Sequence, residues 1–165
     1  MMLDISRIIF EGTILSFVFL AILLVSLYYN PRIWLLDYPK DIQKVAEART
    51  KKENRQFYVI GTIIMSLIAV PFITSIYFEG NEITFLKAFL HLYIVFFMVS
   101  LADLIILDWL IFCLITPNFI IIPGTKGAKG YKDYLFHFIG FLKGAVMYGI
   151  FSLFLAGLRI VVTYF

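Results

Sequence analysis

Residues 85–123 read FLKAFLHLYIVFFMVSLADLIILDWLIFCLITPNFIIIP, the longest apolar stretch of the chain, which two aspartates, Asp103 and Asp108, interrupt. The rest of the stretch has the composition of a membrane-spanning helix. A carboxylate inside such a helix is costly, and it marks a functional site by default. We therefore take Asp103 and Asp108 as the first candidates for a functional site.

The composition of the whole chain indicates an integral membrane protein. Of its 165 residues, 62% are hydrophobic, 18% are aromatic and 15% are charged, which is far from the balance of a soluble globular domain. A chain of this length accommodates a bundle of about four spanning helices of roughly 20 residues each. We predict a single all-α membrane domain, a four-transmembrane-helix bundle that occupies residues 1–165 and contacts the lipid bilayer.

Apolar runs define the four predicted spans. We place them at about 12–29, about 57–78, about 85–107 with an extension to 116, and about 143–164 with an N-terminal extension from 134. Pro71 predicts a kink in the second span. The residues before the first span lack the basic start of a secretory signal peptide, so we expect this span to stay in the mature protein.

The distribution of positive charge predicts the orientation of the bundle. The loop 30–56 carries seven Lys and Arg residues and the loop 117–133 carries three, whereas the turn between the second and third spans is acidic. Because Lys and Arg near helix ends stay on the cytoplasmic side, we predict that both loops are cytoplasmic and both termini lie outside. The composition fits a bacterial plasma membrane.

The third span is too long for a simple crossing. A helix from Phe85 to Thr116 would be about 48 Å long, against a hydrocarbon core of about 30 Å. If the span begins at Phe85, the aspartates lie near the cytoplasmic headgroups; if it begins near Leu92, they lie close to the midplane. We favour the first placement, because the preceding turn is short.

Apolar segments beyond this level predict a small cytoplasmic or interfacial cap, since such surface is unstable in water. We expect the third and fourth helices to pack together beyond the bilayer, with residues 33–36 laid over them. In this region the sequence predicts a helix end at 116–118, a β-like segment at 119–122, a turn at 123–127 and a charged surface helix at 42–56.

The cap would bring ionisable side chains to one level of the bundle. We expect Asp37, Asp41 and Asp133 near the main candidates, which are Asp103, Asp108, His137 and Lys143. Asp103 is either functional or the partner of Lys143 in a structural ion pair. Asp108 lies five residues further on, about 140° around an ideal helix, so we expect the two carboxylates on different faces. A shared metal would then require a local bulge, and we predict no metal site.

Other polar residues have a functional and a structural interpretation. His137 is a candidate proton carrier, a candidate metal ligand together with an aspartate, or a histidine bonded to backbone at headgroup level. Arg32 lies in a segment bounded by two prolines. It is a candidate to bind an anionic lipid headgroup, or it anchors the segment at the membrane surface. We interpret Trp109 as an interfacial anchor, and His91 and Glu11, nearer the outer end, as structural.

Several kinds of chemistry have no signature in this chain. The single cysteine, Cys113, excludes an intrachain disulfide and paired-thiol chemistry. The sequence contains no phosphate-binding glycine loop, no HExxH motif and no GxSxG motif, and it indicates no cofactor and no nucleic-acid partner. We assign no catalytic residue.

Three functions stay open. The first is the binding or transport of a small charged or amphipathic solute, with the ionisable cluster at the cytoplasmic leaflet. The second is a membrane enzyme that uses Asp103 or Asp108 with His137 on a lipid or isoprenoid substrate at the inner leaflet. The third is a structural or accessory subunit that works through a membrane-protein partner or a second copy of itself.

Overall fold

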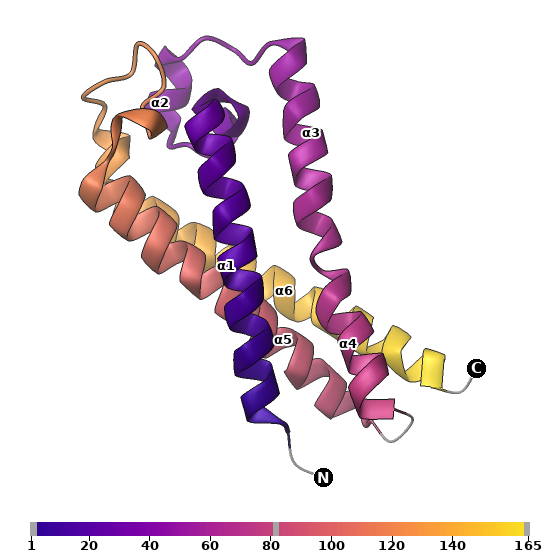
Figure 1. Ribbon diagram of the computed structural model, residues 1–165. Coiled ribbons are helices and arrows are strands. Elements are labelled where there is room, and N and C mark those ends of the chain that lie inside the picture. Colours follow the sequence, from indigo (N-terminus) through magenta and orange to yellow (C-terminus); the bar gives the residue numbers. More distant parts are fainter. Residues whose placement is uncertain (1–2, 81–82, 164–165) are drawn as a thin grey trace.

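The computed structural model describes residues 3–80 and 83–163, and this part of the chain forms helices and no strand. Four of its segments are long and apolar enough to cross a membrane (Figure 1): Ile5–Tyr29, Lys51–Glu79, Phe85–Ile115 and Tyr134–Thr163. The predicted all-α bundle of four membrane helices is confirmed. Large apolar side chains cover its outer surface, as expected of helices that face lipid.

Side-chain caps set where the first and last spans begin. The Asp4 carboxylate accepts a hydrogen bond from the Arg7 backbone N–H at 3.1 Å, so α1 (Ile5–Tyr29) starts before the predicted residue 12. The Asp133 carboxylate accepts from the Phe136 N–H at 2.9 Å, at the start of α6 (Tyr134–Thr163). As expected from the sequence, α6 includes the N-terminal extension of the fourth span.

The second span consists of two helices, α3 (Lys51–Ser66) and α4 (Ala69–Glu79). Pro71 lacks a backbone N–H, and its ring clashes with the carbonyl group four residues earlier, which is that of Leu67. The helix breaks at Leu67 and Ile68 for this reason. The predicted kink is therefore present as a break between two helices.

The prediction of one charged helix over residues 42–56 is wrong, because two separate helices share this segment. Helix α2 (Lys40–Val45) ends before an extended stretch, and α3 starts afresh at a reciprocal cap. The Thr50 hydroxyl accepts from the Glu53 N–H at 3.2 Å, while the Thr50 N–H donates to the Glu53 carboxylate at 2.7 Å.

The third span changes its helix type at the first aspartate. The α-helix α5 (Phe85–Ala102) continues as a π-helix, η3 (Asp103–Ile115), which ends where Thr116 adopts a left-handed backbone with φ of 50°. The Thr116 N–H donates to the Ile111 carbonyl, five residues earlier, at 2.8 Å. In a π-helix, residues five apart lie one turn apart on the same face. Asp103 and Asp108 therefore share a face, and the prediction of different faces is wrong.

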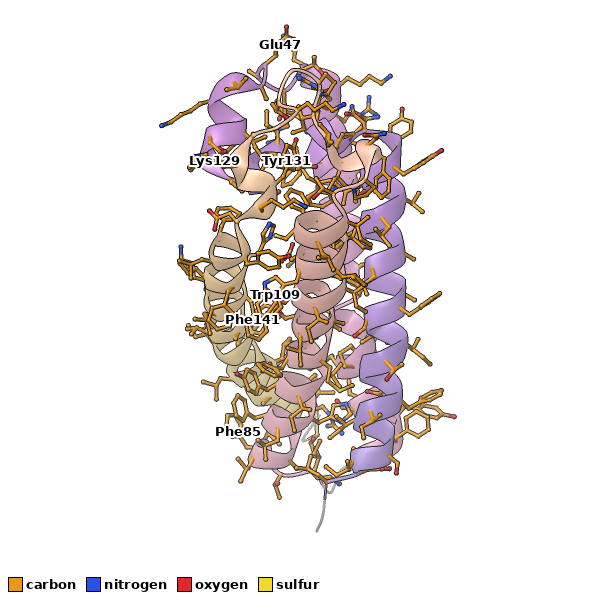
Figure 2. All side chains as sticks on the ribbon, turned by 90° about the vertical axis from the view of Figure 1, so that its left-hand side faces the viewer. Glu47, Phe85, Trp109, Lys129, Tyr131 and Phe141 are labelled. Atoms are coloured by element: carbon orange, nitrogen blue, oxygen red, sulfur yellow. The ribbon has the colours of Figure 1, made fainter. Side chains whose placement is uncertain are left out.

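The cap comprises residues 30–50 and 116–133 and lies at one end of the bundle (Figures 1 and 2). Besides α2 it contains three short helices, η1 (Pro31–Asp37), η4 (Asn118–Ile120) and η5 (Lys129–Lys132). The Tyr38 hydroxyl, buried in its core, donates to the Ile120 carbonyl at 2.9 Å. The predicted cap is confirmed. The prediction of a β-like segment at 119–122 is wrong, because a 3₁₀ turn follows Pro117 and includes Asn118–Ile120.

The helices differ in how tightly they pack. On α6, Ser152 and Ala156 are fully buried against neighbouring helices, and on α1, Gly12 packs against Met98 of α5. Small residues at such positions let helices approach closely. In contrast, Glu53 is the only buried residue of α3. This helix therefore stands apart from the rest of the bundle along most of its length (Figure 1).

Candidate ligand pocket

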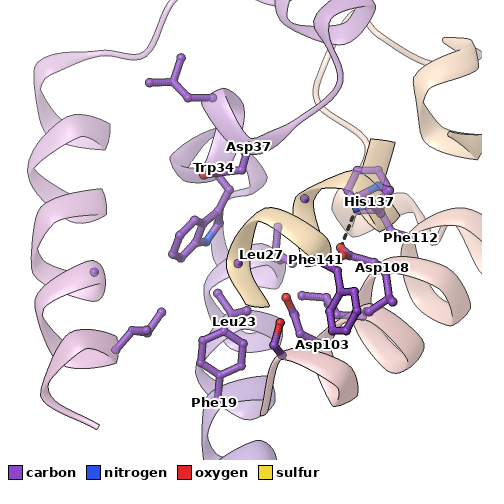
Figure 3. Close-up of a pocket in the computed structure, with 18 of the residues that line it drawn as sticks. Phe19, Leu23, Leu27, Trp34, Asp37, Asp103, Asp108, Phe112, His137 and Phe141 are labelled. Carbon is purple, nitrogen blue, oxygen red and sulfur yellow. Dashed lines mark ion pairs between the residues drawn. The ribbon is translucent and has the colours of Figure 1, made fainter. Parts of the chain in front are cut away.

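A pocket of about 890 Å³ lies beside the cap, within the range of small-molecule sites. Residues from α1, η1, α3, α5, η3 and α6 line it, together with Tyr38 just after η1 (Figure 3). Most of these residues are apolar, and the aromatic ones are Phe19, Trp34, Tyr38, Phe57, Tyr58, Phe112, Phe136, Phe141 and Tyr148. The pocket is therefore a largely apolar chamber, rich in aromatic side chains and open on one side.

The ionisable lining of the pocket is acidic. It consists of Asp37, Asp103, Asp108 and His137, with no Lys or Arg among the lining residues. Figure 3 shows Asp103 and Asp108 projecting toward the pocket from the same side of η3. The π-helix thus turns the carboxylates of Asp103 and Asp108 toward one cavity.

Asp108 and His137 form the best-defined polar contact of the pocket. The Asp108 Oδ1 lies 2.8 Å from the His137 Nδ1, and this contact joins η3 to α6. The histidine is 7% exposed, and its other ring nitrogen, Nε2, has no hydrogen-bond partner within residues 3–80 and 83–163. The carboxylate therefore orients the imidazole, whose Nε2 is buried without a partner.

Asp103 has no counter-ion in the described part of the chain, and its Oδ1 is buried without a partner. The predicted ion pair with Lys143 is not formed. Lys143 is exposed, and it lies six residues after His137, about 240° around α6 at 100° per residue, so it points away from the pocket. Asp103 is thus the ionisable residue of the pocket that has neither a counter-ion nor a hydrogen-bond partner for its buried Oδ1 among the described residues.

Arg32 lies outside the pocket lining and binds Glu53. The Arg32 Nε is 2.8 Å from the Glu53 Oε1, and an Nη2 hydrogen donates to the Ala48 carbonyl at 2.8 Å. The Asn30 side chain also donates to Glu53, at 3.2 Å. These contacts fasten the start of α3 to η1. Sequence reasoning missed Glu53, although the spacing of Thr50 and Glu53 is the signature of a capping box.

The remaining members of the predicted cluster have structural contacts. Asp41 accepts from the Gly130 N–H at 2.8 Å and so ties α2 to η5, and Asp133 caps α6. The Trp109 ring packs against α6, with its centroid 6.3 Å from that of Phe138. Of the residues expected at one level, the structure brings together Asp37, Asp103, Asp108 and His137.

Trp34 of η1 and Tyr38, which directly follows η1, shape the cap side of the pocket. The Trp34 indole donates to the Ser26 hydroxyl at 2.8 Å and lies edge-on to Phe57 of α3, with ring centroids 5.4 Å apart. Burial raises the pKa of Tyr38 above its ordinary value, so its hydroxyl stays protonated and keeps donating to the cap backbone. Trp34 and Phe57 form the contact between η1 and α3 at this wall.

No metal site is evident, because the described residues contain no group of three or more His, Cys, Asp or Glu side chains placed to hold a metal ion. What the pocket offers a ligand is a pair of carboxylates, one oriented imidazole and aromatic surface. These groups suit a molecule that has an apolar body and a polar or charged end.

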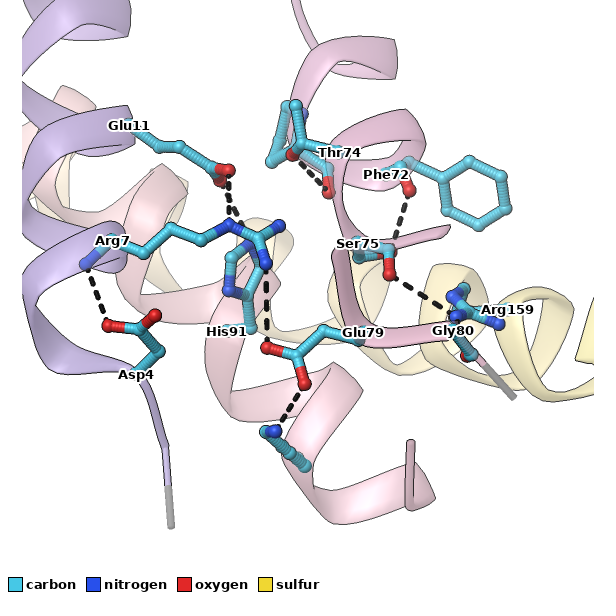
Figure 4. A network of polar contacts seen from close by, with 12 residues as sticks. Asp4, Arg7, Glu11, Phe72, Thr74, Ser75, Glu79, Gly80, His91 and Arg159 are labelled. Atoms are coloured by element: carbon cyan, nitrogen blue, oxygen red, sulfur yellow. Dashed lines mark hydrogen bonds and ion pairs between the residues drawn. The ribbon is translucent and has the colours of Figure 1, made fainter. Parts of the chain in front are cut away.

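A second ionic network closes the opposite end of the bundle (Figure 4). Arg7 of α1 pairs with Glu11 at 2.9 Å and with Glu79 of α4 at 3.5 Å, and Glu79 also pairs with Lys87 of α5. Glu11 in turn lies 2.9 Å from the His91 Nε2. The two cations and two carboxylates balance, and together they join three helices.

Arg159 strengthens the same end from α6. It is 1% exposed and donates to the carbonyls of Ser75 and Gly80 at 3.2 Å and 2.5 Å, and to the Thr163 hydroxyl at 2.6 Å. The carbonyls at the end of a helix lack intrahelical donors, and a guanidinium group satisfies them. Arg159 therefore caps α4.

The chain matches no protein-family model, no curated protein and no solved structure. The geometry of the pocket and the chemistry of its residues are thus the basis for a function.

Proposed function

We propose that this protein binds an amphipathic solute in the pocket and serves its capture or passage at the membrane. The observation that carries this proposal is an aromatic chamber of about 890 Å³ with Asp103, Asp108 and His137 at its polar end. The apolar body of an amphiphile would replace lipid or water against the aromatic walls. Its polar group would satisfy the buried polar atoms of Asp103 and His137.

The packing of α3 supports entry from the bilayer. Helices α3 and α6 both line the pocket, yet no extensive contact joins them in the described part of the chain. On α3, Tyr58 and Met65 line the pocket and are largely exposed. A solute dissolved in the lipid would therefore reach the chamber sideways, between these two helices.

The charge of the loops supports a location at the inner leaflet of a plasma membrane. The cap contains most of the basic residues of loops 30–56 and 117–133, and positive loops stay in the cytoplasm. The cap and the neighbouring pocket would then lie on the cytoplasmic side. The Arg7–Glu79 network would close the outer side, so passage across the membrane would require this network to open.

Quenching of tryptophan fluorescence tests the proposal. Trp34 lines the pocket, and Trp109→Phe leaves it as the only tryptophan of the two in the chain. We expect a single-chain amphiphile with a brominated tail to quench Trp34 in a saturable manner. Cationic, zwitterionic and anionic headgroups are each titrated, so that the test does not presume the charge of the solute.

Two glycines of α6 supply matched variants for this titration. Gly140 lines the pocket and Gly157 does not, and a Cβ atom at either position meets nothing within 4 Å. Gly140→Phe fills the chamber, so we expect it to abolish saturable quenching, whereas Gly157→Phe retains it. Quenching that rises linearly for every headgroup, or equally in both variants, contradicts the proposal.

An enzyme at the inner leaflet is the second candidate, favoured by the Asp108–His137 pair. A carboxylate that orients an imidazole and leaves the second nitrogen free is the arrangement of a general base. Incubation with phosphatidylglycerol or with an isoprenoid diphosphate, followed by mass spectrometry, tests this function. A product that forms with the unaltered protein and not with His137→Gln supports it; the absence of any product favours binding alone.

A further inference from the structure

We propose that the solute of this pocket is a lipophilic organic cation, and that its binding releases a proton from Asp103. This inference rests on the proposed function and names the substrate class and the coupled ion. It is carried by the charges that face the pocket, by the aromatic walls and by the register of the π-helix.

The charges around Asp103 select a cation. The titratable groups that line the pocket with it are Asp108 from η3, His137 and Tyr148 from α6, Asp37 from η1, Tyr38 just after η1, and Tyr58 from α3, while α1 contributes only apolar side chains. No Lys or Arg lines the pocket from any of these elements. An anionic solute would meet like charges in a poorly hydrated chamber, whereas a cation would meet complementary ones.

The aromatic walls suit the same class of ligand. The face of an aromatic ring attracts a cation within about 6 Å, and this attraction strengthens when water is excluded. Trp34, Phe57 and Phe141 line the chamber with the carboxylates. A cation with apolar substituents would thus find counter-charge at one end and aromatic surface around the rest.

The register of η3 and the contacts of the two aspartates indicate that Asp103, and not Asp108, carries the proton that binding releases. One π-helical turn separates Asp103 from Asp108, so two negative charges in the chamber would repel each other. Asp108 has His137 as a hydrogen-bond partner, but the Asp103 Oδ1 is buried without one among residues 3–80 and 83–163. An unpaired buried carboxylate is costly, so the empty pocket holds Asp103 as a neutral carboxylic acid.

Binding of the cation exchanges one positive charge for another. The Asp103 O–H bond breaks, its electron pair stays on the carboxylate oxygen, and the proton leaves to water. The carboxylate then pairs with the bound cation, and the charge of the chamber is conserved. Proton and cation compete for Asp103, so acidification weakens cation binding by up to about tenfold per pH unit.

A matched pair of ions tests this exchange in the purified full-length protein. Tetraphenylphosphonium and tetraphenylborate have the same shape and opposite charge. We expect titration calorimetry to show tetraphenylphosphonium binding at least about tenfold more tightly, a difference of 1.4 kcal/mol or more. Repeating the titration in buffers of different ionisation enthalpy counts the protons, and we expect about one released per cation bound.

Variants of the pocket identify the group that releases the proton. Asp103→Asn is expected to bind the cation at least about tenfold more weakly and to release no proton, since an amide has none to lose. Asp103→Glu keeps the carboxyl group and is expected to restore the release. Glu47→Gln makes the same charge change at an exposed cap position outside the pocket lining and is the control, with proton release retained.

The outcomes separate this inference from the proposed function. Equal affinity for the two ions, or cation binding without proton release, overturns the inference while amphiphile binding stands. Proton release that persists in Asp103→Asn overturns the assignment to Asp103. If neither ion binds and no brominated amphiphile quenches Trp34, the proposed function falls as well.

Discussion

The contact between Asp108 and His137 organises the polar end of the pocket at the scale of single residues. It fixes which imidazole nitrogen contacts Asp108 and gives one of the two carboxylates of η3 a partner. The neighbouring Asp103 has none, and this asymmetry between two aspartates one helical turn apart gives them different roles. Asp108 positions the histidine, whereas Asp103 is the group that a ligand would satisfy.

A double-mutant cycle measures the strength of this contact. Asp108→Ala and His137→Phe each leave one buried polar partner unsatisfied, whereas the double variant removes both. We therefore expect the free energy of unfolding to fall by less in the double variant than the sum of the single changes, by about 1–3 kcal/mol. Unfolding in detergent with increasing sodium dodecyl sulfate measures these values, and simple additivity would rule out a direct interaction.

Gly130 tests the packing of the cap. A Cβ atom there would lie 2.8 Å from the Cβ of Pro39 and would also collide with Asp41, which accepts the Gly130 N–H. Gly130→Ala should lower the free energy of unfolding by about 1–3 kcal/mol. Gly157→Ala is the control, because its added methyl group meets nothing within 4 Å. The same melting temperature for both variants would show that the cap is not packed as described.

At the scale of elements, α3 is the helix whose position defines the open side of the pocket. Apart from Glu53 its residues are not buried, so the contacts at its first turn and the Trp34–Phe57 contact hold it near the bundle. The break at Leu67 and Ile68 separates α3 from α4, which packs against α5 and α6. The structure thus places a loosely held helix beside the chamber.

Loss of Glu53 should loosen α3 specifically. Glu53→Ala removes the partner of Arg32 and the acceptor of the Thr50 N–H, so we expect a loss of about 2–3 kcal/mol in the free energy of unfolding. Hydrogen exchange in α3 should quicken more than in α5 or α6. Glu47→Ala, at an exposed site nearby, is the control. If both variants exchange alike in α3, the contacts of Glu53 do not hold the helix.

The elements also show what the sequence can and cannot predict. Hydropathy predicted the four spans and Pro71 predicted the break, because lipid and proline impose requirements that are visible locally. Asp103, Asp108 and His137 stood out as polar residues among apolar ones. The π-helical register of η3 carries no such local signal, so α-helical geometry placed the carboxylates on different faces. The ion pair with Lys143 was one of two interpretations of Asp103, and it rested only on the predicted depth of the two residues.

At the scale of the whole molecule, polar groups gather at the two ends of an apolar bundle. The pocket and cap lie at one end, and the network of Arg7, Glu11, Glu79, Lys87 and His91 lies at the other. Buried apolar residues, including Leu15, Val95 and Leu155, pack between them. The chamber is therefore separated from the network of Arg7, Glu79 and Lys87 in this structure.

This separation predicts that the two ends respond independently. Glu79→Ala leaves Arg7 and Lys87 without their shared carboxylate, so we expect a loss of about 3 kcal/mol in the free energy of unfolding. The affinity of the pocket for the brominated amphiphile should change less than about threefold, because distant sites act additively. A large loss of affinity at unchanged stability would show that the ionic network at the far end of the bundle is part of the binding site.

The position of a bound amphiphile is the most direct test that the pocket is the binding site. Crystals grown with the brominated amphiphile that binds most tightly would give an anomalous signal from bromine. We expect its peak between α3 and α6, near Phe57 and Phe141, with no peak there in Gly140→Phe. Bromine found only along the lipid-facing surface of the bundle would contradict the account.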